Sequence, residues 1–156
     1  MIRLTPDFKE CLRLFRDHGV EYLLVGGYAV IHYGYVRTTG DMDLWIAVNP
    51  DNAARVAAAL REFGFSTGLS ENLFLKPGPM LRMGRPPFRI EILTSISGLD
   101  FATAYSRRTH HMIDDVEVDV IRLEDLQINK RASGRLKDLA DLEKLDEVSR
   151  KRGKTP

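Results

Sequence analysis

Apolar residues recur along the chain with two periods, and these periods predict helices interleaved with strands. Phe8, Cys11 and Phe15 follow helical spacing behind Thr5 and Pro6, which are typical of a helix start. Short apolar runs bounded by turn residues predict strands instead. By this reasoning we expect helices at 6–18, 28–33, 50–63, 99–107 and, with a break near 133–134, across 123–148. We expect strands at 21–25, 42–48, 73–75, 88–93, 112–113 and 116–120, the last two forming a hairpin. The rest of segment 66–87 is predicted as a loop rich in Gly, Pro and Arg.

Strands interleaved with helices predict an α/β or α+β fold, in which a mixed, twisted sheet is flanked by helices and a C-terminal helical pair. The length of 156 residues and the hydrophobic content of 44% suit a single domain with its own core. We expect that domain to span 1–149, its last helices to cover about 123–148, and the basic segment 150–156 to be disordered.

The composition of the chain favours one cellular compartment. The sequence has no apolar stretch near the roughly 20 residues that a membrane span needs, and its start lacks the layout of a signal peptide. Cys11 is the sole cysteine, so an internal disulfide is excluded. We therefore expect a cytoplasmic protein without a membrane partner.

Charge is close to balanced overall but uneven along the chain. The net charge is +1, whereas residues 130–156 carry nine Lys or Arg against five Asp or Glu. This basic end either faces phosphates or is a solvated tail. Arg82, Arg85 and Arg89 offer the same two interpretations, namely guiding an RNA end or belonging to a solvated loop.

Three acids are the candidate chemistry. Asp41 and Asp43 lie two residues apart at the head of the strand 42–48, so both side chains point to one face of it. Glu91 lies between Ile90 and Ile92 in another strand. Close carboxylates repel one another unless a cation joins them, and a divalent ion with oxygen ligands is the usual solution. An isolated Asp-x-Asp pair is also typical of a solvated strand end, and only its context favours a metal site.

A phosphate site is the second element of the hypothesis. Gly26 and Gly27 follow the strand 21–25 in what we predict is a turn, where bare N–H groups allow phosphate to approach. A triphosphate beside acids also needs balancing cations. Arg37 and the group Lys130, Arg135 and Lys137 are the candidates, with Asp138 orienting one of them.

These residues resemble a known family. The likeness is carried at the front by Gly26, Gly27, Ala29, Arg37, Thr39, Asp41 and Asp43, and at the tail by Leu126, Lys130, Gly134, Arg135, Lys137, Asp138 and Asp141. Together they resemble the nucleotidyltransferase superfamily with the DNA polymerase β-like fold, over about residues 22–145. The likeness is closest to minimal bacterial members related to abortive-infection and toxin–antitoxin nucleotidyltransferases.

The resemblance implies roles for residues. Asp41 and Asp43 would hold Mg²⁺, with Mn²⁺ as the alternative, and Glu91 would take the third acidic position as ligand or base, where family members more often carry aspartate. The nucleotide-binding residues implied are Gly26, Gly27, Arg37, Thr39, Lys130, Arg135 and Lys137.

The implied activity is transfer of NMP from an NTP to a hydroxyl. Candidate acceptors are an RNA 3′ end (a tRNA included), a partner protein or a small molecule. We also expect that a toxin–antitoxin partner, or a second copy of the chain in a homodimer, completes the site. A non-catalytic nucleotide-binding or antitoxin-like module of the same fold remains the alternative.

Overall fold

The computed structural model describes residues 2–35, 37–78 and 80–153. Along these residues the elements are α1 (Pro6–Asp17), β1 (Tyr22–Val25), α2 (Gly26–His32), β2 (Met42–Ile46), α3 (Pro50–Phe63), the 3-10 helix η1 (Glu71–Leu75), β3 (Met80–Arg85), β4 (Phe88–Leu93), α4 (Phe101–Ser106), β5 (Thr109–Ile113), β6 (Val116–Val120), α5 (Leu123–Ser133) and α6 (Leu136–Gly153). The predicted α/β architecture is confirmed, with helices and strands interleaved around one sheet.

Within the described residues the sheet has six strands in the order β3-β4-β2-β1-β6-β5. β2 runs parallel to β4, and β1 runs parallel to β6, whereas the other neighbouring pairs are antiparallel. Strands distant in sequence thus become neighbours. In this order β2 and β4, the strands of the candidate acids, lie side by side within the sheet.

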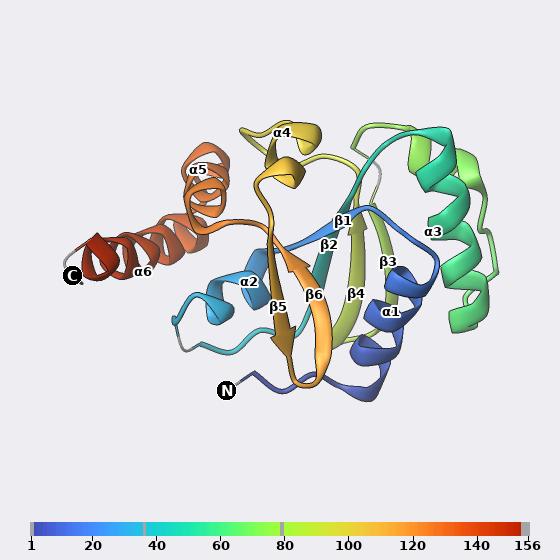
Figure 1. Cartoon of the computed structure of the whole chain (residues 1–156), viewed down its shortest axis with the longest axis horizontal. Helices are drawn as coiled ribbons and strands as arrows, with labels where there is room; N and C mark the ends of the chain where they lie inside the picture. The colour runs from blue at the N-terminus through green and yellow to red at the C-terminus, as the bar shows by residue number, and fades with distance from the viewer. Residues whose placement is uncertain (1, 36, 79, 154–156) are drawn as a thin grey trace.

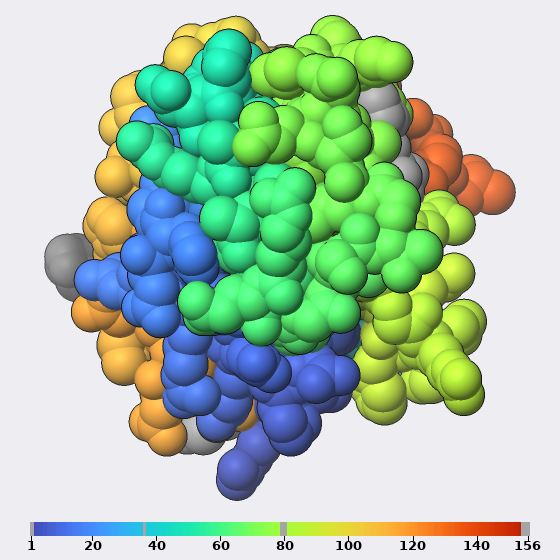
Figure 2. Space-filling model, turned by 90° about the vertical axis from the view of Figure 1, so that its right-hand side faces the viewer, coloured from blue at the N-terminus to red at the C-terminus, as the bar shows by residue number. Residues whose placement is uncertain are grey.

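Helices cover both faces of the sheet. α1 and α3 lie on one side, and α2 lies with α5 and α6 on the other (Figure 1). Figure 2 looks onto the first side, where α3 and the segment after it cover the sheet. The core between these layers includes Phe8, Phe15, Trp45 and Leu60, each at most 1% exposed.

Local sequence explains several element boundaries. The Thr5 hydroxyl accepts a hydrogen bond from the Phe8 N–H at the start of α1, and Asn49 caps α3 through the N–H of Asn52. Gly64 ends α3 in the left-handed conformation. The predicted hairpin is also present, and Asp114 and Asp115 form its turn with positive φ angles of 48° and 68°.

Some predicted elements are wrong. Residues 73–75 belong to η1 rather than to a strand, and the segment 80–85, which we expected to be loop, forms edge strand β3. Gly26 and Gly27 are not a separate turn, because they are the first residues of α2. α6 continues through Gly153, so residues 150–153 are helical rather than a disordered tail. Residues 154–156 lie outside the described part of the chain.

Across the part of the chain that is described, we find no helix with the length and apolar character needed to cross a lipid bilayer.

Candidate active site

The three candidate acids meet in one cleft. β2 and β4 pair in parallel with Asp43 opposite Glu91, and Asp41 lies two residues before Asp43 on the same face. The cleft has a volume of about 650 Å³. We call it the acid cleft; its lining includes the acids Asp41, Asp43 and Glu91, the small or hydroxyl residues Gly27, Thr38, Thr39 and Gly40, and the basic residues Arg37, Arg82, Arg89, Arg135 and Lys137.

Asp43 is the most perturbed of these acids. Burial raises its pKa to about 8 from the ordinary value of 3.8, and hydrogen bonding and repulsion from Glu91, followed by repulsion from Asp41, add to the effect. Its Oδ1 atom is buried without a hydrogen-bond partner among the described residues. The positive charge of Lys130 opposes these effects without outweighing them, and a cation bound between the acids would offset them further.

Two arginines hold the other acids. The Arg82 Nε atom lies 2.9 Å from Glu91 Oε1, and Arg89 Nε lies 3.5 Å from Asp41 Oδ1. With the side chains in these positions, no group of three His, Cys, Asp or Glu within 2–35, 37–78 and 80–153 has the arrangement of a metal site. The oxygen donors and the unpartnered Asp43 Oδ1 atom fit Mg²⁺ in kind, while Arg82 and Arg89 are paired with the other two acids in this structure.

The two glycines at the start of α2 allow close contact with the acid strand. Gly26 has a φ of +68°, and a Cβ added there would lie 2.2 Å from Asp43 Oδ2. A Cβ on Gly27 would lie 2.4 Å from Thr39 Oγ1. Both positions therefore require glycine, because the first turn of α2 packs directly against side chains of the cleft.

Gly40 provides a further close contact, which was not predicted from the sequence. A Cβ at this position would lie 1.9 Å from the carbonyl oxygen of Pro87. The segment before β2 is thus pressed against the start of β4. A glycine directly before the Asp-x-Asp pair was the available signal.

The basic residues form a network with acids of α6. The Arg37 Nη2 atom donates a hydrogen bond to Asp141 Oδ2 at 3.0 Å, and the Arg37 Nε atom lies 3.0 Å from Asp141 Oδ1 as part of the same ion pair. Lys130 Nζ lies 3.1 Å from Asp141 and 3.2 Å from Asp138. Lys130 is buried, is not among the residues that line the acid cleft, and pairs with two carboxylates of α6. Its contact with nucleotide stays a prediction.

Asp138 anchors the end of this network nearest the cleft. Burial acts to raise its pKa, but hydrogen bonds from Ser133, Arg135 and Lys130 outweigh burial and lower the pKa to about 2. Arg135 donates to Asp138 at 2.7 Å while its side chain stays 76% exposed and lines the cleft. This geometry agrees with the expectation that Asp138 orients a neighbouring cation. Lys137 lines the cleft as well.

Comparison with known proteins places the chain among nucleotidyl transferases. Residues 5–155 match the family described as nucleotidyl transferase of unknown function (DUF2204). Among proteins with curated descriptions, none matches the sequence.

A solved structure is similar in fold. It is an antigenic nucleotidyltransferase-like protein from Paracoccidioides brasiliensis, which aligns with a TM-score of 0.53 at 18% sequence identity. The alignment covers 91% of this chain and 77% of the other. At this identity the likeness supports the fold alone.

Proposed function

Since the chain belongs to this family of nucleotidyl transferases, we propose that it moves NMP from an NTP to a hydroxyl in the acid cleft. Asp41, Asp43 and Glu91 are the proposed catalytic residues. The single observation that carries the proposal is the buried Asp43 carboxyl, which meets Glu91 but has its Oδ1 atom without a hydrogen-bond partner among the described residues, within a cleft rimmed by basic side chains. A buried acid with an unsatisfied oxygen, next to cations that suit phosphates, matches the needs of a metal–triphosphate complex.

In this proposal the chain binds the triphosphate through residues on two sides of the cleft. Gly27 and Thr39 contribute from the side of α2 and the segment before β2, and Arg135 and Lys137 contribute from the start of α6. Gly26 leaves room for Asp43, and Arg37 keeps the intervening segment in place through Asp141.

The reaction follows from that placement. The acceptor hydroxyl oxygen attacks the α-phosphorus, a new oxygen–phosphorus bond forms, and the bond between the α-phosphorus and the pyrophosphate oxygen breaks. Glu91 accepts the proton of the hydroxyl, and pyrophosphate leaves toward Arg135 and Lys137. These cations oppose the charge that develops on the leaving group.

Mg²⁺, or Mn²⁺ in its place, is the proposed cofactor. Asp41 and Asp43 would hold it, with Glu91 as a further ligand or as the base. When bound, the ion supplies charge neutralisation of the phosphates and lowers the pKa of the attacking hydroxyl.

The alternative is a non-catalytic nucleotide-binding module of the same fold. The observation that favours it is the pairing of Arg82 with Glu91 and of Arg89 with Asp41. If those pairs persist when nucleotide binds, the acids do not gather a metal ion and no transfer takes place.

The acceptor and the setting are also proposals. An RNA 3′ end, a protein or a small molecule can supply the hydroxyl, and a toxin–antitoxin partner or a second copy of the chain can complete the site. We place the activity in the bacterial cytoplasm.

Transfer of a label tests the function. The protein is incubated with each of the four α-³²P NTPs, Mg²⁺, total RNA and a cell lysate, and labelled RNA and protein are separated on gels. We expect label on an acceptor with the wild type and its loss in Asp41→Asn and Asp43→Asn. Asp51→Asn is the matched control, because Asp51 is an exposed acid of α3 on the other side of the sheet.

Calorimetry with NTP–Mg²⁺ separates the two candidates. Binding without transfer to any acceptor would establish the non-catalytic module. Retention of label transfer by the folded Asp43→Asn protein would overturn the assignment of the acid cleft.

A further inference from the structure

A second hollow lies directly beside the acid cleft. It has a volume of about 690 Å³. We call it the aromatic hollow and define it by the apolar residues that line it, Ile2, Tyr28, Ile31, Phe88, Met112 and Ile113. Arg37, Thr38 and Thr39 line both the hollow and the acid cleft, so this short segment is a shared wall.

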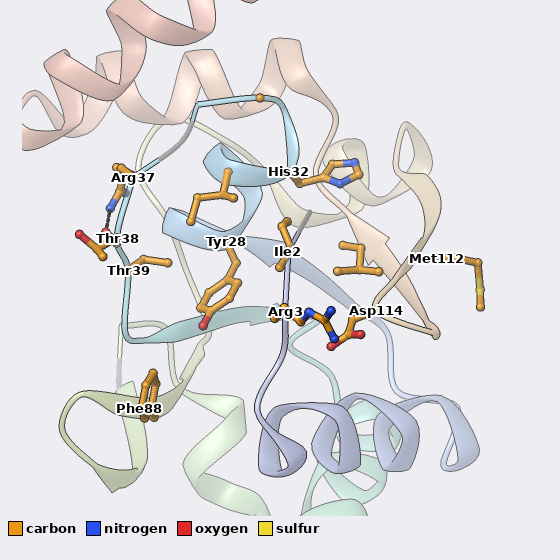
Figure 3. A pocket seen from close by; sticks show the side chains of 13 residues that line it. Ile2, Arg3, Tyr28, His32, Arg37, Thr38, Thr39, Phe88, Met112 and Asp114 are labelled. Atoms are coloured by element: carbon orange, nitrogen blue, oxygen red, sulfur yellow. Dashed lines mark hydrogen bonds between the residues drawn. The ribbon is translucent and has the colours of Figure 1, made fainter.

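The hollow exposes apolar surface that the fold leaves uncovered. Phe88 and Met112 are 51% and 65% exposed, which is unusual for large hydrophobic side chains, and both line it. Figure 3 shows the Tyr28 ring between Thr39 and the N-terminal segment, with Phe88 at the same end of the hollow and Met112 at the other. That end is also the one nearest the shared wall.

The aromatic rings at that end are held in place from beneath. Phe8 of α1 packs edge-on against Tyr28 with ring centroids 5.6 Å apart, and against Phe88 at 6.5 Å. Phe88 thus contacts Phe8 while 51% of it stays exposed. An exposed aromatic ring with such support is what a planar ligand ring can stack on.

The surrounding charge selects the kind of ligand. Arg85 pairs with Phe88 across the β3–β4 hairpin, and Arg89 follows Phe88 in β4. Four of the five basic residues of the acid cleft are paired with acids, whereas Lys137 of the cleft and Arg85 form no ion pair with the described residues. Unpaired cations near an exposed aromatic ring suit a polyanion that presents flat rings, which is single-stranded nucleic acid.

The wall itself favours RNA over DNA. Thr38 and Thr39 place two side-chain hydroxyls between the hollow and the cleft. A 2′-hydroxyl can donate to and accept from such groups, and DNA lacks it.

We propose that the aromatic hollow binds the 3′-terminal base of a single-stranded RNA, which stacks on Phe88 and directs the terminal ribose over the wall into the acid cleft. This assignment rests on the proposed function and names its acceptor. The 3′ oxygen then bonds to the α-phosphorus, pyrophosphate departs with the oxygen that bridged it, and the hydroxyl proton passes to Glu91.

Binding of RNA in the absence of NTP and of divalent ions tests this inference alone. A twelve-nucleotide RNA labelled with fluorescein at its 5′ end is titrated with protein, and anisotropy is recorded. We expect Phe88→Ala to weaken binding by roughly fivefold to a hundredfold and Phe88→Trp to restore it, because stacking depends on the ring. Val48→Ala is the control, since Val48 is an apolar residue with 38% exposure that lines neither the hollow nor the cleft.

A fluorescent base locates the RNA end. 2-Aminopurine at the 3′-terminal position should lose fluorescence on binding to the wild type and keep it with Phe88→Ala. The same base six nucleotides from the end should respond equally in both proteins.

The outcomes separate this inference from the proposed function. NTP–Mg²⁺ binding, measured without RNA, reports on the acid cleft, and we expect Phe88→Ala to leave it within twofold of wild type. RNA binding that depends on the ring of Phe88 supports the hollow as an RNA site even if nucleotide binding fails. Unchanged RNA binding in Phe88→Ala overturns the proposal, as does equal affinity for DNA of the same sequence or transfer of label to a protein in place of RNA.

Discussion

At the scale of single residues, Asp43 determines how the metal-free protein responds to pH. Its pKa is about 8 in the folded state against an ordinary value of 3.8, so the folded state keeps a proton that the unfolded chain gives up. The corresponding stability is fully present below about pH 4 and is lost as the pH rises through 8. In the absence of a cation, the ionised carboxyl therefore opposes folding at alkaline pH.

Replacing Asp43 by Asn, which resembles the neutral acid, should remove this dependence. We expect Asp43→Asn and wild type to be equally stable near pH 4, and the variant to be more stable at pH 8 by on the order of a few kcal/mol. Urea denaturation in EDTA at several pH values measures the difference. Adding Mg²⁺ at pH 8 should stabilise the wild type and leave the variant unchanged. If Asp43→Asn were less stable than the wild type at pH 8, the inference that the ionised Asp43 carboxyl destabilises the metal-free protein would be wrong.

At the scale of elements, the packing of α2 on β2 depends on glycine. Gly26→Ala combines two penalties, the positive φ and the contact of Cβ with Asp43. Gly68→Ala isolates the first, because Gly68 has a φ of +71° and no atom lies within 4 Å of its added Cβ. We expect Gly68→Ala to cost about 1–2 kcal/mol and Gly26→Ala about 1–3 kcal/mol more. Urea denaturation compares the free energies of unfolding of the two variants. Equal losses would show that the Asp43 side chain moves away from the added Cβ at no cost in stability.

Elements with strong local signals were predictable from the sequence. The caps Thr5 and Asn49 fix helix starts by hydrogen bonds within three residues, and Asp114-Asp115 tolerates the conformation of a tight hairpin turn. β3 was missed because its sequence, Met-Leu-Arg-Met-Gly-Arg, lacks β-branched residues and contains Gly84. Its register with β4 over six residue pairs shows that pairing with the neighbouring strand fixes it.

The acids of the site were found by sequence, but their partners were not. Alternation along a strand placed Asp41 and Asp43 on one face, whereas the pairing of Arg82 with Glu91 depends on the unexpected strand β3. The aromatic hollow was not predicted from the sequence either, because residues from distant parts of the chain form it: the N-terminal segment, α2, β4 and β5.

At the scale of the whole molecule, one carboxylate joins the last helix to the segment before β2. Asp141, 2% exposed, is shared by Arg37 and Lys130. Asp141→Asn would leave two cations without their common anion, and we expect it to cost about 3–5 kcal/mol of stability. Glu147→Gln is the control: it breaks the exposed pair with Lys144 at 3.9 Å, and its cost should be under about 1 kcal/mol.

Denaturation midpoints with equal m-values report these costs. An Asp141→Asn midpoint no lower than that of Glu147→Gln would show that Arg37 finds another anion and that Asp138 alone suffices for Lys130.

The pairing of Arg37 with Asp141 spans 104 positions and sets an order of events during synthesis. A nascent chain that has reached α5 already carries all three acids but has no partner for Arg37. The contact that holds the wall shared by the cleft and the hollow to α6 can form only after Asp141 leaves the ribosome tunnel. If the proposed function holds, ribosome-bound chains that stop before residue 136 lack Lys137 and Asp141, and we expect them to bind nucleotide more weakly than the folded protein.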